Sequence, residues 1–105
     1  MGMFDYYRPA AQLLCPICRQ PLVKWQGYDG PNGILVWVEG VSHPVDQDVS
    51  DDVRLEDVDR EKLTLPVHCV IYSHDCSQHS PVEADCDAPE GVWTKTTSRP
   101  FRKIR

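Results

Sequence analysis

Two short stretches with the same spacing decide the fold: Cys15-Pro16-Ile17-Cys18 and Cys76-Ser77-Gln78-His79. Two thiolates separated by two residues in a tight turn can bind one tetrahedral metal ion. The second stretch repeats this spacing and ends on a histidine, so the two halves together form a Cys₃His set, which is typical of closed structural zinc sites. The sequence therefore predicts one structural Zn²⁺ ion held by Cys15, Cys18, Cys76 and His79.

Other residues compete for a place in this site. Cys86 lies just before a turn and is an alternative fourth ligand. His74 precedes Cys76 by two residues and is either a partner of a ligand or an alternative ligand. Cys69 lies in an apolar stretch, where a cysteine is most often a small buried apolar side chain. The 57 residues from 19 to 75 separate the two halves, so strands must bring both turns to one end of a sheet.

The residues after Cys18 bear on the choice between a zinc turn and a redox motif. Glycine often follows the second cysteine of a zinc turn because it accommodates a positive φ, and Arg19 occupies that place here. A redox-active Cys-x-x-Cys motif opens a helix, whereas Pro21 and the β-like residues after it argue against a helix. The five cysteines are an odd number and follow no secretion signal, which favours reduced thiols and a metal.

The rest of the chain has mostly strand-like patterns. Apolar residues predict strands over 22–26, 34–41, 63–73, 81–86 and 92–97, joined by turns over 27–33 and 87–91. The spacing of apolar residues in 50–62 predicts a short helix with Ser50 as its N-cap, and a solvated loop is the alternative. We therefore expect a mainly β fold with a small antiparallel sheet. It forms one zinc-stapled domain over 1–97, followed by a basic tail over 98–105.

The aromatic residues divide between the expected core and the expected surface. Trp25, Trp37 and Trp93 each lie on a predicted strand, which places them in the core. Tyr6 and Tyr28 lie near the N-terminus and in a turn, so we expect them to be exposed contact residues.

Charge is distributed unevenly along the chain. The 105 residues carry a net charge of −5, yet the acidic segment 46–61 alone has eight acidic and two basic residues, a net charge of −6. The last eleven residues, 95–105, contain five basic residues and no acidic one. An acidic segment attracts a basic partner and repels nucleic acid. The alternative is that the basic tail folds back on the acidic segment, so that neither marks a partner.

These features favour a binding function over catalysis. Four protein ligands leave no open position on the zinc ion for a substrate. We expect a small protein-interaction module, a regulator or inhibitor of a larger bacterial machine. The alternatives are a nucleic-acid-binding zinc ribbon that uses the basic tail with Trp93 and Phe101, and a zinc enzyme or redox protein. No stretch is apolar for more than five residues, so we expect a cytoplasmic protein without a membrane segment.

Several short motifs resemble those of one group of small proteins. They are Met1-Gly2-Met3-Phe4-Asp5-Tyr6, Cys15-Pro16-Ile17-Cys18, Trp25-Gln26 with Asp29-Gly30, and Gly91-Val92-Trp93-Thr94. Together they are similar to small bacterial and phage proteins, especially actinobacterial ones, that open with a Met-Phe-Asp-Tyr-like segment. The resemblance implies a stand-alone, zinc-ribbon-like β domain, and it implies no particular activity.

Overall fold

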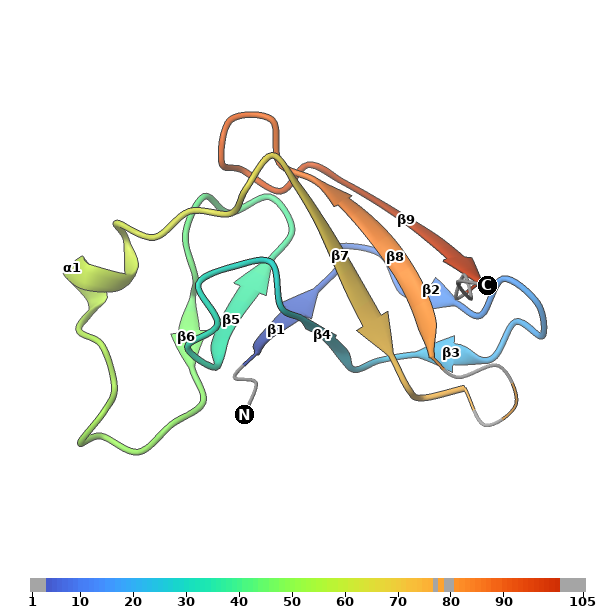
Figure 1. The fold of residues 1–105 in the computed structure, drawn as a ribbon, viewed down its shortest axis with the longest axis horizontal. Coiled ribbons are helices and arrows are strands. Elements are labelled where there is room, and N and C mark those ends of the chain that lie inside the picture. Colours follow the sequence, from blue (N-terminus) through green and yellow to red (C-terminus); the bar gives the residue numbers. More distant parts are fainter. Residues whose placement is uncertain (1–3, 77, 79–80, 101–105) are drawn as a thin grey trace, which may run out of the picture.

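The computed structural model describes residues 4–76, 78 and 81–100, and over these residues the protein is mainly β, as predicted (Figure 1). The strands are β1 (Asp5–Arg8), β2 (Leu13–Leu14), β3 (Pro21–Leu22), β4 (Trp25–Gly27), β5 (Leu35–Val38), β6 (Asp46–Gln47), β7 (His68–Ser73), β8 (Val82–Asp87) and β9 (Lys95–Pro100). The described residues form one helix, α1 (Asp57–Arg60).

Seven strands form one sheet in the order β6-β5-β1-β4-β7-β8-β9, and β2 pairs with β3 in a separate two-stranded sheet. The large sheet is mixed, because β1 is parallel to β5 and antiparallel to β4. The sheet is therefore larger than expected, and it is not purely antiparallel. The physical reason is that β1 lies between β4 and β5, which keeps those two sequential strands from pairing with each other.

The predicted helix over 50–62 is much shorter in the structure, where only Asp57–Arg60 is helical and Glu56 occupies the N-cap position. Ser50 instead accepts the Val53 N–H in a turn through its carbonyl. Val53 and Val58 are both more than half exposed, so this segment buries no apolar face that would support further helical turns. In the described part of the chain, no helix has the length and apolar character needed to cross a membrane.

One face of the sheet carries the core. Trp25, Trp37 and Trp93 are each at most 1% exposed, which confirms their predicted place. The largest other side chains of the core are apolar or aromatic and come from strands of both sheets: Tyr7, Leu22, Leu35, Ile71 and Val82. The ring of Tyr7 packs edge-on against that of Trp93, with centroids 5.8 Å apart. The core therefore joins β1 in the middle of the sheet to the segment that leads into β9.

A buried carboxylate ties β1 to the turn that follows β4. Asp5 has no exposed surface, and its two carboxylate oxygens accept four hydrogen bonds. The donors are the backbone N–H groups of Asn32 (3.0 Å), Gly33 (2.9 Å) and Leu35 (3.0 Å) and the indole N–H of Trp37 (3.1 Å). A Cβ atom at Gly30 would lie 2.9 Å from both Asp5 Oδ2 and the Tyr7 hydroxyl, so this turn has no room for a side chain there.

We predict that Asp5→Asn destabilises the protein by about 2–4 kcal/mol, because either orientation of the amide turns its NH₂ group toward two buried donors. Urea denaturation measures the free energy of unfolding. Asp52→Asn, in the exposed acidic segment, is the matched control and should change that free energy by less than about 0.5 kcal/mol. An Asp5→Asn variant as stable as this control would contradict the role given to the carboxylate.

Candidate metal centre

The first half of the site is a short hairpin. β2 and β3 pair antiparallel with Leu14 opposite Pro21, so residues 15–20 form the connecting turn. The Cys15 N–H donates to the Gln20 carbonyl and the Arg19 N–H donates to the Cys15 carbonyl, both at 2.9 Å. These bonds close the turn and leave Cys15 buried and Cys18 exposed.

Arg19 adopts the conformation that glycine usually supplies in such turns. Its φ is +68°, in the left-handed region. This conformation costs a residue with a Cβ atom about 1–2 kcal/mol. Arg19 therefore replaces the glycine expected after the second cysteine, and the turn keeps a positive φ at this position.

The second half of the site is brought alongside by the large sheet. β4 follows the hairpin and pairs antiparallel with β7, with Gln26 opposite Tyr72. This register places the residues before β4 next to those after β7. Asp75 fixes the junction, because its Oδ2 atom accepts the N–H groups of Val23 (2.6 Å) and Lys24 (2.7 Å). Pairing of β4 with β7 thus closes the long separation between the two halves.

Three sulfur atoms meet at this junction. The Sγ atoms of Cys15, Cys18 and Cys76 all lie within 4.8 Å of one another, and those of Cys18 and Cys76 are 3.5 Å apart. All three cysteines are free, and 3.5 Å is far longer than a disulfide bond. Two sulfurs that bind the same tetrahedral zinc ion at about 2.3 Å lie about 3.8 Å apart. The cluster therefore has the spacing of ligands that share one ion, and it could hold a metal.

The thiols of this cluster differ in acidity. Burial acts to raise the pKa of Cys15, but the N–H groups of Cys18 and Ile17 and the neighbouring thiols outweigh it and lower the pKa to about 6. The Gln20 N–H acts to lower the pKa of Cys18, yet burial and the adjacent sulfurs raise it above its usual value. One thiolate therefore forms readily, and a second beside it needs a compensating positive charge. A bound metal cation would supply that charge.

The remaining candidate ligands have different placements. His79 lies outside the described residues. Cys86 is buried in β8, directly opposite Cys69 in β7, and does not belong to the sulfur cluster of the described residues. Cys69 has no exposed surface, which confirms it as a buried apolar side chain, and burial raises the pKa of its thiol to about 12. His74 is exposed and is also not a member of the cluster.

Asp75 and Gln20 are the supporting residues that the cysteine spacing did not reveal. The Gln20 side-chain amide donates to the Asp75 carbonyl at 2.9 Å, so each half of the site binds the other. The pKa of Asp75 is lowered, first by the Lys24 N–H and then by the Val23 N–H, against the opposing effect of burial. The only sequence signal for this role is the position of Asp75 directly before Cys76.

The proposal that Trp93 contacts nucleic acid beside the basic tail is wrong for this residue. Trp93 has no exposed surface, and its indole N–H donates to the Thr96 hydroxyl at 2.8 Å and the Lys95 carbonyl at 3.2 Å. Phe101 lies outside the described residues. The ring of Trp93 therefore belongs to the core and cannot stack on a base.

Comparisons of this chain with protein-family models, with curated proteins and with solved structures find no match. The chemistry of the site therefore rests on its own geometry.

We predict that Asp75→Ala weakens zinc binding by about 10- to 100-fold, because the carboxylate that orients both halves of the site is lost. Competition with a chromogenic chelator measures this affinity. Asp51→Ala removes an exposed acidic side chain from the acidic segment and is the control, with unchanged affinity expected. Equal zinc affinity in the two variants would show that Asp75 does not support the site.

Proposed function

We propose that this protein is a small binding module whose fold is stabilised by one structural zinc ion. The observation that carries the proposal is the convergence of Cys15, Cys18 and Cys76, from two segments far apart in sequence, within 4.8 Å. Three thiolates are soft ligands and suit zinc. His79 completes the set as the fourth ligand, with the same spacing from Cys76 as Cys18 has from Cys15.

A structural role for the metal is supported by the groups around the cysteines. A catalytic zinc ion requires an open position and a nearby base. Asp75 is the acidic residue adjacent to Cys76, and its Oδ2 atom already accepts two backbone N–H groups. Bound zinc would instead hold the β2–β3 hairpin against the end of β7. In small zinc domains such binding contributes on the order of 10 kcal/mol to folding.

The acidic segment 46–61 supports a protein partner with a basic surface. Ion pairs of Asp46 with Arg54 and Asp57 with Arg60 engage both basic residues of the segment, so its other six acidic residues have no cation within the segment. The segment and α1 extend from the β6 edge of the sheet (Figure 1). A module of this kind acts as a regulator or inhibitor of a larger assembly by presenting this charge to a basic subunit.

We predict one zinc ion per chain, and loss of both the ion and the cooperative fold in Cys76→Ala. Native mass spectrometry and elemental analysis measure the stoichiometry, and circular dichroism follows the fold. Cys86→Ala is the matched control, because it removes a buried thiol outside the cluster and should keep one zinc ion. Comparing the zinc content of His79→Ala with that of this control tests whether His79 is the fourth ligand.

Two results would contradict the structural zinc site. The first is a chelator-treated protein that keeps the melting temperature of the untreated sample. The second is a Cys76→Ala variant that retains stoichiometric zinc.

A further inference from the structure

The face of the large sheet opposite the core carries aromatic side chains. Tyr6 pairs with Gln26, and Gln26 pairs with Tyr72, so these three residues lie side by side on neighbouring strands. Tyr7, the neighbour of Tyr6 in β1, points to the core, which places Tyr6 on the other face. Val36 of β5 extends the row on the far side of Tyr6.

Four rings form a continuous cluster on this face, which we name the aromatic face: Phe4, Tyr6, Tyr28 and Tyr72. The ring centroid of Phe4 lies 5.2 Å from that of Tyr6 and 6.5 Å from that of Tyr28. The centroid of Tyr28 lies 6.3 Å from that of Tyr72. Tyr28 is 52% exposed and the other three are half-buried. A contiguous and partly exposed group of aromatic side chains is a candidate interaction site.

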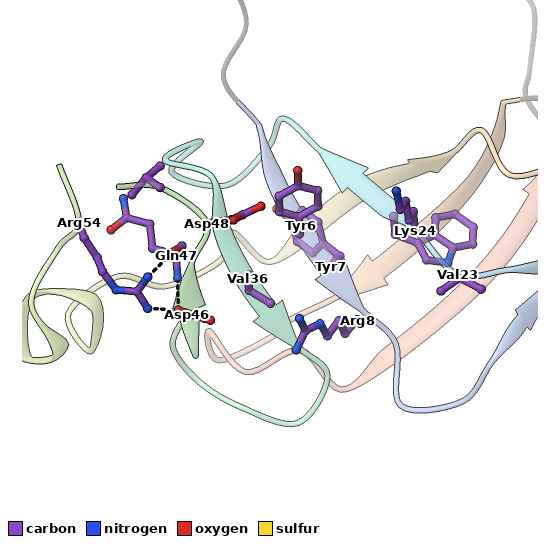
Figure 2. Close-up of a pocket in the computed structure, with 12 residues that line it drawn as sticks. Tyr6, Tyr7, Arg8, Val23, Lys24, Val36, Asp46, Gln47, Asp48 and Arg54 are labelled. Atoms are coloured by element: carbon purple, nitrogen blue, oxygen red, sulfur yellow. Dashed lines mark hydrogen bonds and ion pairs between the residues drawn. The ribbon is translucent and has the colours of Figure 1, made fainter. Parts of the chain in front are cut away.

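A groove of about 540 Å³ adjoins the aromatic face. Figure 2 shows Tyr6, Val36, Arg8 and Lys24 around it, with Asp46 bound to Arg54 at the opposite side. Arg8 and Lys24 are exposed and take part in none of the ion pairs found among residues 4–76, 78 and 81–100. Asp46 and Arg54 neutralise each other. The other charged residues that line the groove are these two cations and one acid, Asp48.

Each of the two cations lies two residues along the chain from a member of the row Tyr6, Gln26 and Tyr72. Arg8 follows Tyr6 by two residues in β1, and Lys24 precedes Gln26 by two residues. Residues two apart in a strand share a face and lie about 6.6–6.8 Å apart. Two cations therefore lie beside the row of Tyr6, Gln26 and Tyr72, Arg8 at the end of β1 and Lys24 just before β4. A single strand of nucleic acid presents phosphates beside its bases in the same way.

We propose that the aromatic face binds single-stranded nucleic acid, with bases stacked on Tyr28 and its neighbouring rings and phosphates held by Arg8 and Lys24. This goes beyond the proposed structural role of zinc. The bases of a duplex are stacked on each other and cannot lie on these rings, which selects for a single strand. The charge of the groove itself permits it, because Arg8 and Lys24 outnumber Asp48 once the Asp46–Arg54 pair is excluded. Of the acidic residues of the segment 46–61, Asp46, which is paired with Arg54, and Asp48 line the groove, while α1 extends away from the β6 edge of the sheet (Figure 1).

The test is fluorescence anisotropy of a labelled twelve-nucleotide oligothymidine with the full-length, zinc-loaded chain. We expect affinity that falls as salt is raised from about 50 to 200 mM, with a logarithmic slope near −1.4 for two phosphate contacts. Arg8→Gln or Lys24→Gln should reduce the slope by about 0.7. Lys62→Gln removes an exposed charge in the loop that follows α1 and should change neither slope nor affinity.

Stacking is tested separately with Tyr28, which is the most exposed ring. Tyr28→Ala should weaken binding by about 5- to 150-fold, whereas Tyr28→Phe keeps the ring and should bind like the unaltered chain. Circular dichroism confirms that both variants are folded. Val58→Ala, which shortens an exposed side chain in α1, is the control for loss of exposed apolar surface.

Three outcomes would overturn the proposal. One is the absence of salt-dependent binding at 100 µM protein. Another is equal affinity for a duplex of the same length. The third is binding of an arginine-rich peptide, sensitive to Tyr28→Ala, by a chain that does not bind oligothymidine, which would make this face a protein-docking surface. Each of these leaves the zinc stoichiometry unaffected, so the two proposals fail separately.

Discussion

The structure depends on the junction between the β2–β3 hairpin and the end of β7. Asp75 accepts two N–H groups from the residues that precede β4, and β4 pairs with β7, so the hairpin and the second cysteine turn cannot separate without breaking the sheet. Three sulfurs are thereby confined within 4.8 Å. As thiolates they would repel one another, and a shared cation would make the arrangement favourable. The backbone positions the three thiols, and a metal bound there would stabilise the backbone in turn.

Short-range sequence patterns predicted the fold class. The features that they did not predict depend on pairing between segments far apart in the chain. Strand periodicity predicts the regions around β4, β5, β7, β8 and β9, and the three tryptophans are in the core as expected. The place of β1 between β4 and β5 could not be predicted, because four residues carry little periodicity and Asp5 reads as polar surface. Its carboxylate is buried only because a turn some thirty residues away supplies the donors. The helix over 50–62 was overestimated because its valines have nothing to pack against.

The residues of the candidate site divide in the same way, into those that short-range spacing predicts and those that long-range contacts determine. Cys15, Cys18 and Cys76 could be chosen from spacing alone, since a metal imposes that spacing locally. Asp75 could not, because its role is to accept N–H groups that lie about fifty residues earlier in the chain. The aromatic face likewise needs the strand order, which brings Tyr6 and Tyr72 to either side of Gln26. The cysteine cluster and the aromatic face thus both depend on β4, which pairs with β1 on one side and with β7 on the other.

X-ray absorption at the zinc edge is the sharpest test of the proposed shared ion, because it reports the atoms bound to the ion and not the stability of the chain. We expect three sulfur ligands at about 2.3 Å and one nitrogen ligand at about 2.0–2.1 Å. A first shell made only of oxygen and nitrogen, or one with fewer than three sulfurs, would contradict it. Such a shell would mean that the three cysteines meet for packing alone.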